Sequence, residues 1–110
     1  MVWRDIDELY EVSDEGEVRR KKDGKILKQY KQKSGYNAVY LKDKNGWVGI
    51  RMVHRLVAMA FLPIIMDKPY VDHINTIRSD NRLCNLRWAS PLDNANNETT
   101  KLNRRKKIKI

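Results

Sequence analysis

Residues 70–97 read YVDHINTIRSDNRLCNLRWASPLDNANN, and this stretch predicts two strands followed by a helix. The segments YVDHI and NLRWAS combine β-branched, aromatic and apolar residues and lie about ten residues apart. Ser90 and Pro91 are the residue types that favour a helix N-cap and a first helical position. Six of the 28 residues are Asn, which prefers turns and caps to element interiors. We therefore expect a strand, a densely hydrogen-bonded loop, a second strand and a helix.

The chain upstream of this stretch predicts a helix preceded by a β-meander. HRLVAMAFL, residues 54–62, spaces its apolar side chains with helical periodicity, and Pro63 ends the segment. Turn signals at 13–16, Asp23-Gly24, Gly35 and 44–46 divide residues 9–53 into three to five short antiparallel strands. The expected fold class is α+β, with a small N-terminal antiparallel meander, a helix, and a strand–strand–helix unit.

Basic side chains gather in two blocks. The 110-residue chain has a net charge of +9 and a pI of about 9.8. Residues 1–17 hold seven of the 14 acidic side chains, whereas residues 19–33 carry eight Lys or Arg against one Asp, and residues 101–110 carry six cations and no acid. Two such blocks favour contact with a nucleic-acid phosphate backbone. A solvated, solubilising surface is the alternative for either block alone.

Cysteine and histidine counts exclude several classes of site. Cys84 is the only cysteine, so an internal disulfide cannot form, and with only His54 and His73 available no Cys/His zinc cluster can be assembled in one chain. The sequence contains no apolar run of 18 residues and no signal-peptide pattern at its start. We expect an intracellular protein with no membrane partner.

Three polar side chains of the 70–97 stretch point to metal-assisted chemistry. Asp72 and His73 are strand neighbours, which face opposite ways unless the strand end re-aims one of them. Asn94 falls in the first turn of the helix expected to pack across the hairpin. Two oxygen donors suit a divalent ion such as Mg²⁺, and a nearby imidazole can take a proton from water. This combination indicates phosphodiester hydrolysis. For a lone strand histidine the alternative is a structural role.

The sequence resembles a known family at this point. HRLVAMAFLP, VDHIN, DNRLCNLRW and DNANN are similar to the HNH endonucleases of phage and intron homing type. WRDIDELYEVSDEGEVRR resembles the nuclease-associated modular DNA-binding motif found upstream of that domain. The resemblance implies a ββα-metal nuclease motif over 54–100, a β-rich DNA-binding region over 1–53 and a basic tail over 101–110.

The resemblance also implies residue roles. His73 would be the general base that activates water, and Asp72 and Asn94 would be the metal ligands, for Mg²⁺ or alternatively Mn²⁺. Asn85 would bond across the loop and hold the two strands in register. Thr76 and Ile77 stand where a glycine often follows in the family.

We therefore expect a metal-dependent endonuclease that acts on duplex DNA in the cytoplasm of a bacterial or phage-infected cell, as a monomer or a homodimer. A catalytically inactive DNA-binding module of the same fold and an RNA-binding protein are the alternatives. His54 is expected to bond locally or to a phosphate, and Trp3, Trp47 and Trp88 to lie in the core. Asn75, Asn81, Asn96 and Asn97 are expected to serve turns and caps, with contact to DNA as the alternative for Asn96 or Asn97. The cations expected to contact DNA are Arg19, Arg20, Lys21, Lys22, Arg87, Arg104, Arg105, Lys106 and Lys107.

Overall fold

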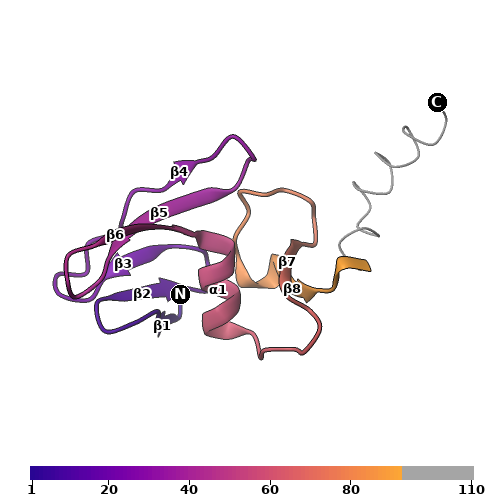
Figure 1. The fold of residues 1–110 in the computed structure, drawn as a ribbon, viewed down its shortest axis with the longest axis horizontal. Helices are drawn as coiled ribbons and strands as arrows, with labels where there is room; N and C mark the ends of the chain where they lie inside the picture. Colours follow the sequence, from indigo (N-terminus) through magenta and orange to yellow (C-terminus); the bar gives the residue numbers. More distant parts are fainter. Residues whose placement is uncertain (93–110) are drawn as a thin grey trace.

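The computed structural model describes residues 1–92 and contains two three-stranded antiparallel sheets, one α-helix and a two-stranded ribbon (Figure 1). These elements confirm the α+β fold class. The first sheet comprises β1 (Trp3–Asp5), β2 (Tyr10–Ser13) and β3 (Val18–Arg20), and the second comprises β4 (Tyr30–Lys31), β5 (Asn37–Lys42) and β6 (Val48–Met52). They are followed by α1 (Val53–Phe61), β7 (Tyr70–His73), the 3₁₀ turn η1 (Leu83–Asn85) and β8 (Leu86–Ala89).

The N-terminal strands differ from a single meander in two respects. They form two separate sheets: residues 25–27 fold back against β3, with a bridge between Arg19 and Ile26, and β4 then begins a new sheet with β5. The structure also adds β1, which pairs Trp3 with Ser13. This strand is short, polar and mostly exposed, so it has no apolar alternation that would reveal it in the sequence.

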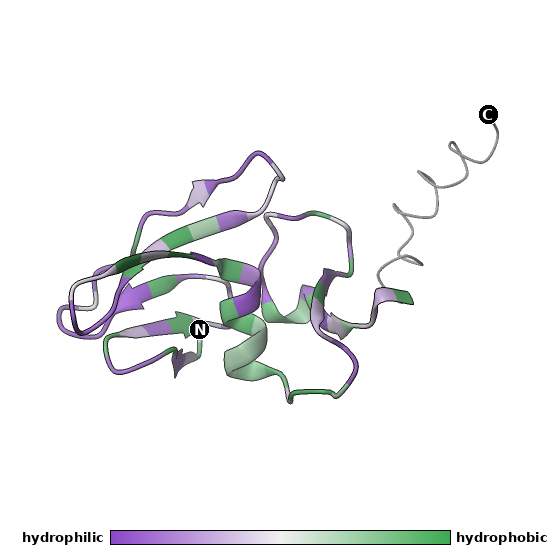
Figure 2. Ribbon diagram, in the orientation of Figure 1, coloured by the Kyte–Doolittle hydropathy of each residue, from purple (hydrophilic) through white to green (hydrophobic). Residues whose placement is uncertain are grey.

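The core lies between the two sheets and α1. Val12, Val18 and Val39 are fully buried, and Val53 and Val57 cover them from one face of the helix. Figure 2 shows hydrophobic residues along α1 and the strands beside it. The Tyr10 hydroxyl joins the sheets by accepting a 3.1 Å hydrogen bond from the Lys42 backbone N–H. The apolar spacing that predicted α1 is therefore the spacing that fills the core.

Helix α1 connects the sheets to the β7–β8 ribbon. It contacts β2 and β5 on one side and β7, β8 and η1 on the other, and Figure 1 shows it between these two parts of the molecule. Val71 and Leu86 of the ribbon belong to the same apolar cluster as the sheet valines. The ribbon is thus anchored to the core, which fixes the position of the loop between its strands.

The three tryptophans do not share the core position expected for them. Trp47 follows the tight turn at Gly46 and is 76% exposed, so its core assignment is wrong. Trp3 is half-buried beneath the Arg19 guanidinium, 4.0 Å from its ring centroid. Only Trp88 packs against the apolar cluster. Aromatic size alone did not distinguish a turn residue from a core residue.

Within residues 1–92, no helix has the length and apolar character needed to cross a bilayer.

Candidate functional site

The candidate site is built on the loop that joins β7 to β8. The two strands pair Asp72 with Arg87 and His73 with Leu86, so His73 is the last residue of its strand. The chain then turns at Thr76, whose backbone N–H donates to the His73 carbonyl at 2.9 Å. Thr76 adopts φ +66°, a left-handed conformation that usually requires glycine. The turn expected to depend on glycine therefore forms with a threonine.

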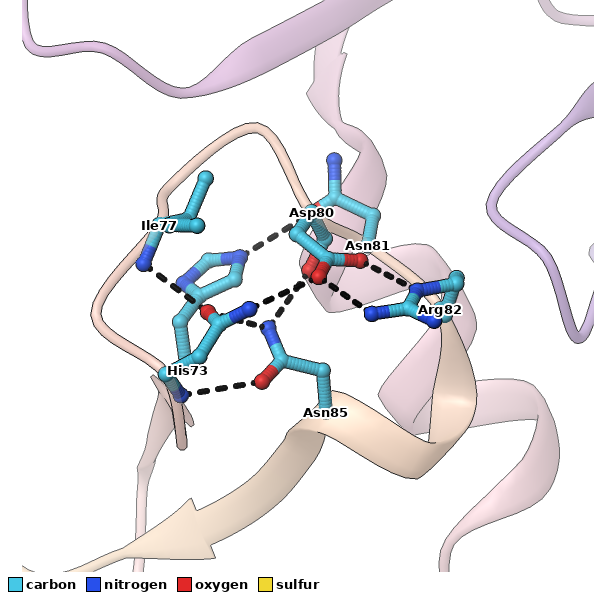
Figure 3. A network of polar contacts seen from close by, with 7 residues as sticks. His73, Ile77, Asp80, Asn81, Arg82 and Asn85 are labelled. Atoms are coloured by element: carbon cyan, nitrogen blue, oxygen red, sulfur yellow. Dashed lines mark hydrogen bonds and ion pairs between the residues drawn. The ribbon is translucent and has the colours of Figure 1, made fainter.

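Asn85 ties this loop together, as Figure 3 shows. Its side-chain oxygen accepts from the Asn75 backbone N–H at 2.9 Å, and its Nδ2 donates to Asn75 Oδ1 and to the Asp80 carbonyl, both at 2.9 Å. Asp80 in turn holds Arg82 through two bonds of 2.8 and 2.7 Å. The hydrogen bonds from Arg82 are the main reason that the pKa of Asp80 lies well below its usual range. These hydrogen bonds restrain the loop, while the buried Nδ2 of Asn81 has no hydrogen-bond partner among residues 1–92.

His73 lies beneath this loop and is only 4% exposed. Its Nε2 lies 2.7 Å from the side-chain oxygen of Asn81, which is also buried. The ring centroid is 5.8 Å from that of Tyr36 and 5.2 Å from that of His54. One ring nitrogen is thus hydrogen-bonded to an amide. The ring also lies next to two aromatic side chains, Tyr36 just before β5 and His54 in α1.

His54 is the second histidine of this cluster. It is buried and stacks on Tyr36, with ring centroids 4.7 Å apart and planes inclined by 26°. Its Nδ1 makes no hydrogen bond within the described residues. Burial, together with the nearby His73 and Arg55, lowers the pKa of His54 to about 4. His54 is therefore neutral at neutral pH, and the structure shows neither a local bond from this nitrogen nor an exposed position for contact with a phosphate.

Asp72 is buried next to His73 in sequence and is paired with a cation. The Arg87 Nε and Nη2 donate to its Oδ2 at 3.0 and 2.9 Å across the two strands. Arg87 was expected to contact DNA, and the structure gives it this second role. A buried carboxylate compensated by a cationic group is a hard oxygen donor of the kind that Mg²⁺ prefers.

No cluster of three or more His, Cys, Asp or Glu residues able to hold a metal occurs in residues 1–92. The predicted ligand set does not require one, since it combines the Asp72 carboxylate with the Asn94 amide. Asn94 lies outside the described residues, as do Arg104, Arg105, Lys106 and Lys107. Pro91 and Leu92, the last described residues, are helical, and the rest of the helix predicted to carry Asn94 lies outside the described residues.

Three cations at the start of the 19–33 block are paired within the chain. Arg19 binds Glu11 at 3.1 Å, Arg20 binds Asp23 at 2.7 Å and Lys21 binds Asp5 at 3.0 Å. The Arg20 guanidinium and the Lys25 N–H lower the pKa of Asp23 to about 2. Lys22 is exposed. The acidic and basic blocks looked separate in the sequence, but strand pairing brings them together.

The sequence did not identify Asn81 and Tyr36 as site residues. It predicted a local bond or a phosphate contact for His54, which instead packs between Tyr36 and His73. Asn81 was assigned to a turn, because the only signal was the general abundance of Asn in the loop. Tyr36 and His54 reach His73 through tertiary packing across more than 15 residues of chain. No local motif encodes such a contact.

Comparisons with known proteins match both halves of the chain. Residues 1–42 match the family model of the NUMOD4 motif, and residues 51–96 match that of the HNH endonuclease. The DNA endonuclease I-HmuI of Bacillus phage SP01 is 36% identical over 104 residues, which cover 92% of this chain and 59% of that protein. The uncharacterized HNH endonuclease L247 of Acanthamoeba polyphaga mimivirus is 37% identical over 99 residues, covering 84% of this chain and 25% of that protein.

A solved structure of I-HmuI, described as DNA binding and cleavage by the HNH homing endonuclease, has the same fold. It aligns with a TM-score of 0.83 and 34% identity, covering 98% of this chain and 66% of that one. The chain therefore spans less than two thirds of the length of the relatives that it matches.

Proposed function

This chain belongs to the HNH endonucleases that carry an N-terminal NUMOD4 motif, and we propose from this that it hydrolyses phosphodiester bonds in duplex DNA with a divalent metal ion. The observation that carries the proposal is the Asp72–His73 pair, held at the end of β7 within the segment that matches the HNH family. The name and structure description of I-HmuI support DNA as the substrate.

His73 is the general base in this proposal. Water attacks the phosphorus, and its proton passes to the imidazole. The bond from phosphorus to the 3′ oxygen breaks, and the leaving 3′ oxygen takes a proton from solvent water to become a hydroxyl. An imidazole suits this step because its ordinary pKa lies near neutrality. The hydrogen bond from Nε2 to Asn81 and the rings of Tyr36 and His54 support a fixed ring orientation.

HNH endonucleases generally depend on a divalent metal ion, and in this chain Asp72 and Asn94 would hold it. Mg²⁺ is the preferred ion and Mn²⁺ the alternative, because both ligands offer oxygen. When bound, the ion would stabilise negative charge that develops on the phosphate. The buried Asp72 carboxylate, balanced by Arg87, supports its assignment as a ligand. The role of Asn94 rests on the sequence motif.

Duplex DNA is the proposed partner, bound mainly through its phosphates. The ion pairs of Arg19, Arg20 and Lys21 reduce their contribution, since each is engaged with a carboxylate of the same chain, Glu11, Asp23 and Asp5 in turn. Lysines that follow in the same block are exposed, among them Lys28, Lys31 and Lys33. We assign the larger share of phosphate contact to these lysines and to the basic residues 101–110.

Nicking of a supercoiled plasmid tests the proposal. We expect cutting with Mg²⁺ and none with EDTA. His73→Ala should cut about 10²- to 10⁴-fold more slowly, because it lacks the general base, and should bind DNA like the original chain. Cys84→Ala, which alters an exposed residue of the same loop, is the control and should cut normally. His73→Ala cutting at the original rate would refute the mechanism. Tight binding without any cutting would favour the inactive DNA-binding module.

A further inference from the structure

The hydrogen bond between His73 and Asn81 determines which ring nitrogen carries the proton. Asn81 presents its side-chain oxygen to Nε2 at 2.7 Å, and an amide oxygen can only accept. With the amide in this orientation Nε2 donates, which leaves Nδ1 as the nitrogen with the lone pair in the neutral ring. Both residues are about 95% buried, so bulk water does not compete for this bond.

Asn81 is contacted by a turn near the N-terminus, far from it in the sequence. The turn between β2 and β3 brings Gly16 against it: a Cβ built on Gly16 would lie 2.9 Å from the Asn81 carbonyl oxygen and 3.0 Å from its Cβ. Gly16 is buried and has φ +84°. Two residues earlier, the Asp14 carbonyl accepts from the Leu83 N–H at 2.7 Å. The turn thus contacts the loop at Asn81 and again at Leu83, two residues later.

The β2–β3 turn is itself rigid. Ser13 is fully buried, and its Oγ accepts from the backbone N–H groups of Glu15 and Glu17 at 3.2 and 3.0 Å. The Gly16 carbonyl accepts from Gln29 Nε2 at 2.7 Å. A turn restrained in this way can act as a fixed support for the loop that it contacts.

We propose that Asn81 is a positioning residue that holds His73 with the proton on Nε2, and that Gly16 keeps Asn81 in place. The segment matching the NUMOD4 motif is then a structural part of the catalytic site, in addition to any contact that it makes with DNA. This inference rests on the proposed role of His73 as general base, but its first test does not use activity.

The first test is the tautomer of His73, read from the ¹⁵N shifts of its ring in protein without DNA or metal. The chain has only two histidines, so His54→Phe identifies the His73 signals. At a pH above the titration of the ring, we expect the Nε2–H tautomer in the original chain. Asn81→Asp retains an oxygen at the same position and should keep that tautomer. Asn81→Leu has similar size but no acceptor and should give a mixture.

A dominant Nδ1–H tautomer in the original chain would overturn the proposal, because it would mean that Asn81 donates. An unchanged tautomer in Asn81→Leu would overturn it as well. If the tautomer behaves as expected but His73→Ala still cuts, the positioning of the ring stands and the proposed mechanism fails. The two failures are thus distinguishable even if Asn81→Leu does not fold, because the original chain and Asn81→Asp supply the tautomer.

The second test compares two glycines with the same backbone conformation. Gly16 and Gly46 have φ +84° and +86°, but a Cβ on Gly46 would meet no atom within 4 Å. Ala at either position therefore introduces similar backbone strain, whereas only Gly16→Ala displaces Asn81. We expect Gly16→Ala to shift the His73 ring signals and to lower kcat roughly 10- to 100-fold at unchanged DNA affinity. Gly46→Ala should do neither. If both variants shift the His73 ring signals and kcat equally, or neither does, Gly16 does not keep Asn81 in place.

Discussion

Thr76 occupies a backbone conformation that its side chain disfavours. A β-branched residue at φ +66° is strained, and the strain persists because the loop around it is fixed by the bonds of Asn85 and Asn75. The Thr76 N–H also closes the turn onto the His73 carbonyl. Thr76 therefore helps to fix the turn that follows His73, and its strained backbone lowers the stability of the fold.

Thr76→Asn should stabilise the protein by about 0.5–1 kcal/mol, because Asn tolerates the left-handed region and retains the backbone N–H. Thermal or urea unfolding measures the gain. Thr76→Val, which keeps the branched Cβ, is the matched control and should give no increase. A lower melting temperature in Thr76→Asn would show that the threonine side chain makes contacts worth more than the strain.

The buried His54 makes stability depend on pH. Its pKa falls from 6.5 in the unfolded chain to about 4 in the folded protein, so between these values only the unfolded state binds the proton. The stabilisation is complete above pH 6.5 and is lost as the pH falls towards 4. The shift corresponds to roughly 3 kcal/mol. Melting temperatures measured from pH 7 to pH 4 should fall, and the fall should be shallower in His54→Phe. Parallel curves for the two proteins would contradict this assignment.

At the residue scale, the sequence predicted what lies close along the chain. Asp72, His73 and Asn85 could be identified because their spacing forms a motif. The hydrogen bond from His73 to Asn81 spans eight residues of an irregular loop, and the contact of Asn81 with Gly16 spans 65. Neither contact has a periodicity or turn signature, so neither could be predicted.

At the scale of elements, the β7–β8 ribbon holds the proposed metal ligand through its register. Because Asp72 pairs with Arg87 and His73 pairs with Leu86, a slip of one residue would remove the cation from the carboxylate. The residue types of both strands were evident from the sequence. Their register was not, since it is fixed by the loop hydrogen bonds and by the packing of Val71 and Leu86 in the core.

Asp72→Ala should abolish the stabilisation that Mg²⁺ confers if Asp72 is a ligand. A ligand that binds only the folded state raises its stability by RT ln(1 + [L]/Kd), so the original chain should melt at increasing temperature as Mg²⁺ is added. Asp23→Ala, which removes another ion-paired carboxylate, is the control and should keep the response. Melting temperatures of Asp72→Ala that rise with Mg²⁺ as in the original chain would exclude Asp72 as a ligand.

The helix could be predicted from the sequence, whereas the grouping of the strands into sheets could not. Helix α1 follows from apolar spacing and the proline after it, both of which are local. The division of the strands into two sheets depends on long-range contacts, such as that between Tyr10 and Lys42. The exposure of Trp47 depends on its place at a turn tip, which hydrophobicity does not indicate.

At the scale of the whole molecule, the affinity for DNA should depend on residues 101–110, which contribute six cations. Their removal should weaken binding to all duplexes alike and reduce the slope of log affinity against log salt by up to about 5, at roughly 0.9 per phosphate. Cleavage at saturating DNA should continue, because Asp72, His73 and Asn94 precede the deletion. Unchanged affinity and slope would assign these residues to solubility alone.

Although cations and acids pair on the first sheet, charge is unevenly distributed over the described residues. Residues 1–23 carry eight acidic and five basic side chains, whereas residues 24–92 carry four acidic and twelve basic ones. Seven of these twelve basic side chains and one of the four acids lie within residues 24–52, which include the second sheet, whereas residues 53–92 carry five and three. In Figure 1 the second sheet lies beside the first, and the β7–β8 ribbon lies beyond α1. The protein is therefore an electric dipole, and the field of a polyanion turns such a molecule before contact. For the proposed DNA partner, collisions that begin at the first sheet are disfavoured, and the second sheet is turned towards the phosphates.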